Sequence, residues 1–362
     1  MQTHRKAVLV IAPIILVLLF AGVVGLVRYF SNSNETVPPN VINNEEVLPV
    51  LVPHLLNGVL VEPAIAKRHP VAAMIENSTA ARPQVGLTSA DVVYEAVSEG
   101  GITRFMAVYS QVLPEKAGPV RSARSYFIDW LSEFDAFYVH AGGSPTALQR
   151  IGAYGIKDYP HSNDGTYARE PMPGVASEHT LFANIAKVFE FGVSKKGWSA
   201  ETDFTSWKFK DAEASLPLGG TVDINFSSAS FAVKWTIDKT TNTYIREMAG
   251  AAHKDRLSGE QITAKTVIAM TVQRSANAAY STGKESEWNM TTIGSGNASI
   301  FIDGKQIRGT WNKPSRTERT KFLDEAGNEI TLNRGKIWVE VVPQTGSFGF
   351  TPETPPAPAT TP

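Results

Sequence analysis

Residues 7–27 form the stretch that most limits how this chain can be placed and folded. The stretch has no charged residue and is almost wholly apolar. As a helix, about 21 residues at 1.5 Å each span about 31 Å, the thickness of a bilayer hydrocarbon core. Arg5 and Lys6 precede it, and such basic residues usually stay on the cytoplasmic side. We therefore expect residues 7–29 to be a transmembrane signal anchor, with 1–6 in the cytoplasm and the bulk outside.

A cleaved signal peptide is the alternative for this segment. A short apolar core and a small-residue cleavage site would favour cleavage, and neither is evident. The chain has no cysteine, which excludes disulfides, thiolate metal sites and a cysteine nucleophile. It also excludes the lipidated cysteine of a lipoprotein. We therefore expect a single-pass protein of the cell membrane, anchored by peptide alone.

The whole chain has ordinary globular composition. Hydrophobic residues make up 43%, charged residues 19%, and the formal net charge is −1. Such a chain lacks the excess positive charge that attracts nucleic acid. Local composition and hydrophobic periodicity predict a flexible stalk (30–58), an α+β domain (59–198), a connector (199–219), a β-rich domain (220–346) and a disordered Pro/Thr tail (347–362). The expected fold class is α+β, with a mixed sheet-and-helix layered first domain.

The segment DVVYEAVSEGGITRFMAVYS, residues 91–110, predicts a hairpin with an acidic and basic face. The glycine pair at 100–101 favours a two-residue turn, which places Val97 opposite Arg104. Alternation along the strand then places Glu95 and Glu99 on the same face as Arg104. These groups either line a functional cleft or form a structural ion pair on a solvated face.

The segment GPVRSARSYFIDW predicts a helix start with two arginines beside it. Ser122 is suited to cap the helix, and Arg121 and Arg124 flank the cap. Free N–H groups and guanidinium groups together suit a phosphate or a carboxylate. The alternative is that both arginines pair with acidic residues inside the fold.

The segment FYVHAGGSPTALQ predicts a strand, a glycine loop and a helix. His140 ends the strand, Gly142 and Gly143 turn the chain, Ser144 caps the helix, and Pro145 takes its first position. Such a loop can present backbone amides to an anion, and the histidine is placed for proton transfer. A hydrogen-bonded structural histidine is the alternative.

Two further polar residues complete the candidate site. Arg169 falls in a predicted loop, and His179 precedes a helix that we expect to begin near Leu181. His179 either joins His140 or caps that helix. No known metal-ligand spacing occurs, so we expect no metal and no cofactor.

Several stretches together resemble the YerB-like family of bacterial envelope proteins. They are ARPQVGLTSADVVYEAVSEGGITRF, GPVRSARSYFIDW and FYVHAGGS in the first half, and YIREMAGAAHKD, GKQIRGTWNKP and residues 322–343 in the second. The resemblance covers about residues 60–345. It implies a layered α+β fold and a place at the outer face of the membrane, but no activity. Many members are lipoproteins, from which this chain departs by lacking cysteine.

Three functions remain open at this point. The first, which we expect, is binding of an anionic envelope ligand such as a phosphorylated glycan, a lipid-linked precursor or a peptide carboxylate. The second is an envelope hydrolase or a phosphoryl- or glycosyl-transfer enzyme, with His140, Glu95 or Glu99 as candidate catalytic groups. The third is a non-catalytic scaffold for envelope protein partners.

Overall fold

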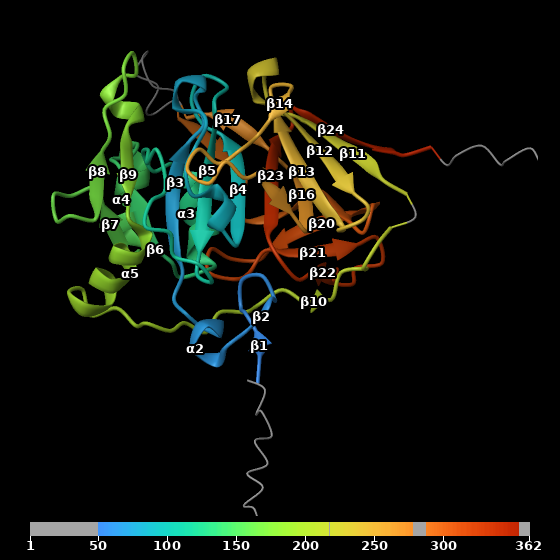
Figure 1. Cartoon of the computed structure of the whole chain (residues 1–362), viewed down its shortest axis with the longest axis horizontal. Helices are drawn as coiled ribbons and strands as arrows, with labels where there is room; N and C mark the ends of the chain where they lie inside the picture. Colours follow the sequence, from blue (N-terminus) through green and yellow to red (C-terminus); the bar gives the residue numbers. More distant parts are fainter. Residues whose placement is uncertain (1–49, 217, 278–286, 355–362) are drawn as a thin grey trace, which may run out of the picture. The chain divides into compact units, whose positions relative to one another are not determined.

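The computed structural model describes residues 50–216, 218–277 and 287–354 (Figure 1). Within these ranges, no helix is long and apolar enough to cross a membrane. The predicted anchor at 7–29 and the cytoplasmic segment at 1–6 lie outside the described residues, so both stay predictions.

Short helices and many strands alternate along the described chain. The helices are α2 (Pro63–Ala66), α3 (Ser125–Ser132), α4 (Pro145–Ala153) and α5 (Ile185–Ser194), with 3-10 turns η1 (Thr79–Ala81), η2 (Leu87–Ser89), η3 (Ser177–His179) and η4 (Ala229–Phe231). The large sheet has the spatial order β21 (Lys321–Asp324), β20 (Lys305–Lys313), β19 (Gly294–Ile302), β16 (Thr266–Val272), β23 (Ile337–Pro343), β4 (Val92–Val97), β5 (Thr103–Tyr109), β3 (Val71–Glu76), β6 (Phe137–His140) and β7 (Asp158–Pro160). The second sheet has the order β14 (Ala251–Ala252), β13 (Thr243–Met248), β12 (Ala232–Asp238), β11 (Gly220–Asn225) and β24 (Ser347–Pro352), and β15 (Thr263–Ala264) pairs with β13. Small pairs are β1 (Val52–Pro53) with β2 (Leu60–Val61), β8 (Tyr167–Arg169) with β9 (Leu181–Ala183), β10 (Phe209–Lys210) with β22 (Leu332–Asn333), and β17 (Arg274–Ala276) with β18 (Trp288–Met290).

The large sheet runs through both predicted domains. Strand β23, from the second half of the chain, pairs in parallel with β4 from the first half, and Glu340 lies opposite Glu95 (Figure 1). The prediction of a mixed first part and a β-rich second part is confirmed. Five strands of the second half extend the sheet of the first, so the two parts share one sheet.

The two faces of this sheet are covered by different elements. All residues of α3 are buried, and Tyr126 and Trp130 of this helix pack in one core with Tyr94 of β4. The second sheet covers the other face, where the Trp338 ring contacts Phe105 and Trp235 at centroid distances of 5.5 and 5.4 Å. Burying one such large side chain contributes about 1.5–3 kcal/mol, so both faces are strongly held.

The folded part begins before residue 59 and ends after residue 346, the limits predicted from composition and periodicity. Strands β1 and β2 pair, and Leu56 is 1% exposed, so the last residues assigned to the 30–58 stalk belong to the fold. Strand β24 pairs with β11 inside the predicted 347–362 tail. Phe348 and Phe350 of this strand pack against the core, and their burial stabilises an otherwise polar segment.

Local capping positions the helices of the first half. Ser144 accepts a hydrogen bond from the Ala147 N–H at 3.3 Å, and Pro145 occupies the first helical position, so both predictions are confirmed. The predicted helix start near Leu181 was wrong, because that residue belongs to β9. The helix begins at Ile185, after Asn184 accepts from the Lys187 N–H at 2.9 Å.

Candidate functional site

The β4–β5 hairpin is closed by a longer loop than its glycine pair predicts. Ala96, rather than Val97, lies opposite Arg104, and residues 98–102 form the loop. A displacement of one residue moves side chains to the other face of a strand. Glu95 and Arg104 therefore lie on opposite faces of the sheet, and the predicted shared face was wrong. Arg104 lies on the face covered by α3, whereas Glu95 lies on the face covered by the second sheet.

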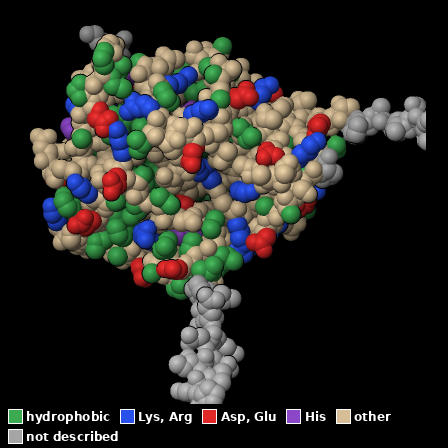
Figure 2. Space-filling view, viewed as in Figure 1, with side chains coloured by type: hydrophobic (Ala, Val, Ile, Leu, Met, Phe, Trp, Pro, Cys, Tyr) green, Lys and Arg blue, Asp and Glu red, His purple; other side chains and the backbone are tan. Residues whose placement is uncertain are grey.

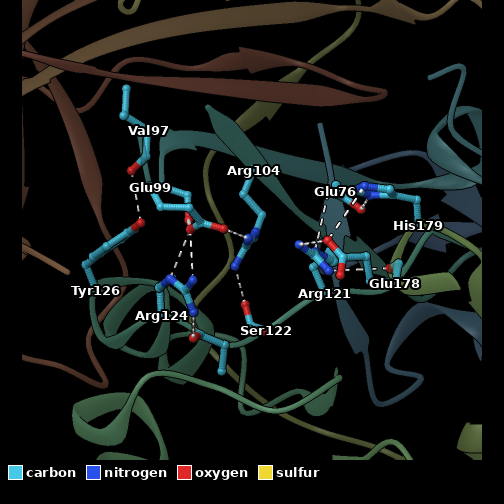
Figure 3. Close-up of polar contacts among 12 residues, drawn as sticks. Glu76, Val97, Glu99, Arg104, Arg121, Ser122, Arg124, Tyr126, Glu178 and His179 are labelled. Atoms are coloured by element: carbon cyan, nitrogen blue, oxygen red, sulfur yellow. Dashed lines mark hydrogen bonds and ion pairs between the residues drawn. The ribbon is translucent and has the colours of Figure 1, made fainter. Parts of the chain in front are cut away.

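Glu99, on the hairpin loop, holds two arginines at once (Figure 3). Its Oε1 lies 2.5 Å from Arg104 Nη2, and its Oε2 accepts from Arg124 Nη2 at 2.8 Å and Nε at 3.2 Å. The Glu99 side chain is 26% exposed, against 2% for Arg104 and 7% for Arg124. Burial alone would raise the pKa of Glu99, but the two guanidinium groups lower it to about 2. This trio is named the Glu99 cluster below.

The start of α3 supports the Glu99 cluster through backbone carbonyl groups. Arg104 Nη1 donates to the Ser122 carbonyl at 2.7 Å, and Arg124 Nη1 donates to the Ala123 carbonyl at 3.0 Å. The predicted cap at Ser122 was wrong, because Arg124 occupies the cap position and α3 begins at Ser125. Ser122 contributes its carbonyl oxygen, and no side-chain cap bond forms at this helix.

Arg121 belongs to a neighbouring group of charges rather than to the Glu99 cluster. Its Nε lies 3.4 Å from Glu76 Oε1, and its Nη2 lies 3.8 Å from Glu178 Oε1. His179 Nδ1 lies 2.9 Å from Glu76 Oε2. Glu76 is buried, whereas the Arg121 side chain is 24% exposed and that of Glu178 is 61% exposed. These four residues, called the Arg121 corner, are drawn beside the Glu99 cluster in Figure 3.

His140 has both ring nitrogens engaged inside the fold. Nδ1 lies 2.7 Å from the Gly142 carbonyl oxygen, and Nε2 lies 2.7 Å from Asp158 Oδ1. The residue is 1% exposed. A general base needs a free nitrogen within reach of a substrate proton. The interpretation of His140 as a structural histidine therefore fits this geometry better than catalysis.

The glycine loop after His140 makes internal contacts. Gly142 has φ +68°, and its carbonyl oxygen accepts from the Ala123 N–H at 2.9 Å. Gly143 forms a bridge with Ala123, and the Ser144 hydroxyl donates to Glu287 Oε1 at 2.6 Å. The loop before α4 is thus hydrogen-bonded to the segment before α3, through Ala123, and to the second half of the chain, through Glu287.

Arg169, on β8, is exposed and its Nη1 donates to the Ser177 carbonyl at 2.5 Å. Ser177 opens the η3 turn that carries Glu178 and His179. Arg169 therefore braces the turn of the Arg121 corner from the β8 side.

Glu95 takes part in a buried charge group that the sequence reasoning missed. It accepts from Thr103 Oγ1 at 2.6 Å, and its other oxygen pairs with Arg246 of the second sheet. Arg246 Nη2 also lies 3.9 Å from Glu340 Oε1, and all three charged side chains are 0% exposed. Burial, followed by the charge of Glu95, raises the pKa of Glu340 well above its usual range.

One sequence signal could have found this group. Arg246 falls in the buried phase of the alternating strand TYIREM, and Glu340 interrupts the apolar run IWVEVVP. A charged residue at such a position requires a partner. The partner of each charge could not be predicted from the sequence. Arg246 lies 151 positions from Glu95, and it belongs to a different sheet from Glu340.

The positions of the carboxylates argue against glycosidic chemistry. Glu95 and Glu99 lie on different sides of the sheet, and Glu95 is sealed between sheets. Such chemistry needs two carboxyl groups that flank one bond. In the described ranges, no group of three or more His, Asp or Glu side chains is arranged to hold a metal ion.

Fold and site together define a two-part mixed α/β protein, with a large shared sheet and an arginine–glutamate cluster at a helix start. The chain belongs to the family described as "Protein of unknown function (DUF3048)", whose N-terminal domain matches residues 56–199 and whose C-terminal domain matches residues 222–339. Together with a relative and a solved structure that both carry the name YerB, this match confirms the resemblance to YerB-like proteins. The chain is 29% identical over 299 residues to a Bacillus subtilis (strain 168) protein named "Putative lipoprotein YerB", covering 80% of this chain and 85% of that protein. The crystal structure of YerB from Bacillus subtilis has the same fold, with a TM-score of 0.72 and 24% identity over 82% of this chain and 99% of that one.

Proposed function

We propose that this chain is a single-pass protein of the cell membrane whose folded part lies outside the cytoplasm. The support is the name of the relative, "Putative lipoprotein YerB", and the apolar stretch at 7–27 within the predicted anchor. This sequence contains no cysteine for a lipid to modify, so the apolar stretch would take over the anchoring. Protease treatment of intact cells tests this: the folded part should be cut, whereas protection of the folded part until lysis would contradict the placement.

We propose further that the Arg121 corner binds an anionic component of the cell envelope. The observation that carries this proposal is the state of Arg121. Its side chain is 24% exposed, and its contacts with Glu76 and Glu178 are all 3.4 Å or longer. A bidentate arginine–carboxylate pair has bonds of about 2.7–2.9 Å. Arg121 therefore retains capacity for a better acceptor.

The charges around Arg121 permit exchange of one carboxylate for a ligand. Glu178 is 61% exposed and only loosely held, at 3.8 Å from both Arg121 and His179. An arriving phosphate or carboxylate would take its place, because exposed ion pairs at such distances contribute little. His179 would lie beside the same anion as a second donor. Glu76, buried behind both, would keep their orientation.

The Glu99 cluster plays a supporting part in this proposal. Arg104 and Arg124 are almost fully buried and already share the carboxylate of Glu99. They raise the local positive potential without contacting the ligand. Of the arginines predicted to bind a ligand at the start of α3 and on the hairpin, only Arg121 therefore keeps that role in this proposal.

The test uses the full chain in detergent and N-acetylglucosamine 1-phosphate as a phosphorylated-sugar probe. A rise in melting temperature with this probe, and none with N-acetylglucosamine, is the expected result. A ligand at a hundredfold excess over its Kd stabilises the folded state by about 2.7 kcal/mol. Arg121→Gln should abolish the rise, whereas Arg308→Gln, at an exposed arginine of β20, should leave it unchanged.

The other two functions are outcomes of the same experiment. Release of inorganic phosphate from the probe would favour the transferase or hydrolase hypothesis. A folded Arg121→Gln variant with the same rise as the unmodified chain would refute the Arg121 corner as the site. No rise with any anionic probe would favour the scaffold hypothesis.

A further inference from the structure

A cavity of about 760 Å³ lies away from the Arg121 corner, where the two halves of the chain meet. It is bounded by the end of α3, by residues 199–205 and by the loop between β20 and β21. Small-molecule sites usually have volumes of about 300–1,000 Å³. We call it the connector cavity, and the lining residues that matter here are His69, Glu133, Asp135, Phe204, Arg319 and Lys321.

Arg319 lines this cavity with most of its hydrogen-bonding capacity unused. The residue is 4% exposed, and its Nε donates to the Thr205 carbonyl at 3.0 Å. Neither Nη1 nor Nη2 has a hydrogen-bond partner. The guanidinium carbon lies 4.1 Å from the Trp207 ring centroid and 4.3 Å from that of Phe134. Aromatic faces attract a cation, but they accept none of its in-plane N–H bonds.

The buried carboxylate of Glu133, which lines the same cavity, is already occupied by other donors. Glu133 Oε1 accepts from the Tyr94 hydroxyl at 2.7 Å. Its Oε2 accepts from the Thr320 N–H at 2.5 Å and lies 3.4 Å from Lys313 Nζ. Lys313 is fully buried and is the counter-charge of Glu133. Arg319 is therefore a surplus buried cation, and such a charge is strongly unfavourable without an anion.

Two of the acidic residues at the rim do not neutralise Arg319, because they pair with lysines. Asp135 Oδ2 lies 2.5 Å from Lys157 Nζ, and Asp203 Oδ1 lies 3.2 Å from Lys67 Nζ. Glu201 and Glu318 also line the cavity, but neither lies within ion-pair distance of Arg319. Among the described residues, the charge of Arg319 therefore has no paired carboxylate.

We propose that the connector cavity binds a small molecule bearing a carboxylate or phosphate group, with Arg319 as the residue that receives its anionic end. Phe204 is the gate of this site. It is half-buried, lines the cavity, and covers the guanidinium group with its ring at 4.9 Å. Rotation of this ring opens the path from the cavity to the two free Nη groups. A ligand oxygen on each Nη would satisfy the fork geometry of the guanidinium.

The test uses the full-length Arg121→Gln chain in detergent, so that binding at the Arg121 corner does not contribute. Its melting temperature is followed in sodium acetate, in sodium phosphate and in sodium chloride of equal ionic strength. We expect acetate or phosphate to raise it above the chloride value. A rise with acetate alone indicates a carboxylate ligand, and a rise with phosphate alone indicates a phosphoryl ligand. No rise with either anion overturns the proposal.

Replacement of Arg319 by methionine separates a binding role from a structural one. Arg319→Met keeps an unbranched side chain among the aromatic rings but removes the charge. It should abolish the anion-dependent rise and melt no lower than the parent in chloride, because a surplus buried charge is lost. Arg308→Met, at an exposed arginine of β20 that does not line this cavity, should keep the rise. A folded Arg319→Met chain with the parent's anion response overturns the proposal.

A second variant covers the case in which Arg319→Met does not fold. Phe204→Ala retains Arg319 and removes the covering ring. Its anion response should reach half-saturation at a concentration several-fold lower than in the parent. An unchanged or higher half-saturating concentration contradicts the route to Arg319.

Discussion

Loss of the Glu99 carboxylate should destabilise the protein in a pH-dependent way. The pKa of Glu99 is lowered from an ordinary value of 4.5 to about 2. At 1.36 kcal/mol for each tenfold change in proton affinity, this lowering corresponds to about 3 kcal/mol of stability. We expect Glu99→Gln to lose about this much at pH 7, because Arg104 and Arg124 then keep their charges without a buried counter-charge.

The direction of the pH effect follows from the lowered pKa. The contribution of Glu99 is complete above pH 4.5 and is lost as the pH falls towards 2, where the folded state also takes up the proton. Urea denaturation of both chains at pH 7, 5, 4 and 3 measures the free energy of unfolding. The difference between wild type and Glu99→Gln should be largest at pH 5–7 and should shrink steadily below pH 4.5.

A matched control is the Glu178→Gln variant. Glu178 is 61% exposed and lies 3.8 Å from both Arg121 and His179, so its loss should cost less than about 1 kcal/mol at pH 7. The reasoning is refuted if Glu99→Gln costs as little as Glu178→Gln. It is also refuted if the cost of Glu99→Gln is the same at pH 7 and pH 3.

Three further changes test the rest of the fold by urea denaturation at pH 7. Arg246→Met leaves Glu95 buried without its partner and should lower the free energy of unfolding by about 3–5 kcal/mol. Adding Glu95→Met should recover part of this loss, whereas a loss under 1 kcal/mol for Arg246→Met would contradict a buried ion pair. Ser144→Ala removes a helix cap and should cost about 1 kcal/mol, whereas Thr146→Ala, whose hydroxyl has no hydrogen-bond partner, should be nearly neutral; equal losses would argue against the cap. Gly304→Ala places a side chain at φ +66° and should cost about 1–2 kcal/mol, and a neutral result would mean that the turn relaxes.

The Glu99 cluster shows which contacts could be predicted from the sequence and which could not. It correctly singled out Glu99, Arg104 and Arg124 as charged neighbours, because they lie within a short stretch around a hairpin and a helix start. The hairpin register was misjudged because glycine pairs are compatible with loops of several lengths. One residue of displacement then sent Glu95 to the opposite face, where it meets Arg246.

The sequence left two alternatives for the arginines, a bound anion or a carboxylate inside the fold, and could not decide between them. Whether a guanidinium group is free or paired depends on its exposure, and exposure depends on how sheets and helices cover one another. Figure 2 shows basic and acidic side chains interspersed over the face in view, as the near-neutral composition indicates. The surplus charge at Arg319 lies inside, where composition gives no guide.

Features that depend on residues a few positions apart were determined by the sequence itself. Ser144 and Pro145 start α4, Asp303 and Gly304 turn β19 into β20, and β12 buries alternate residues, because each is a local preference of backbone and side chain. The tertiary structure alone decided that β23 joins β4, that Glu95 meets an arginine of the second sheet, and that Arg319 is left without an acceptor. These outcomes reflect free energy shared among many distant contacts, and no short stretch of sequence contains it.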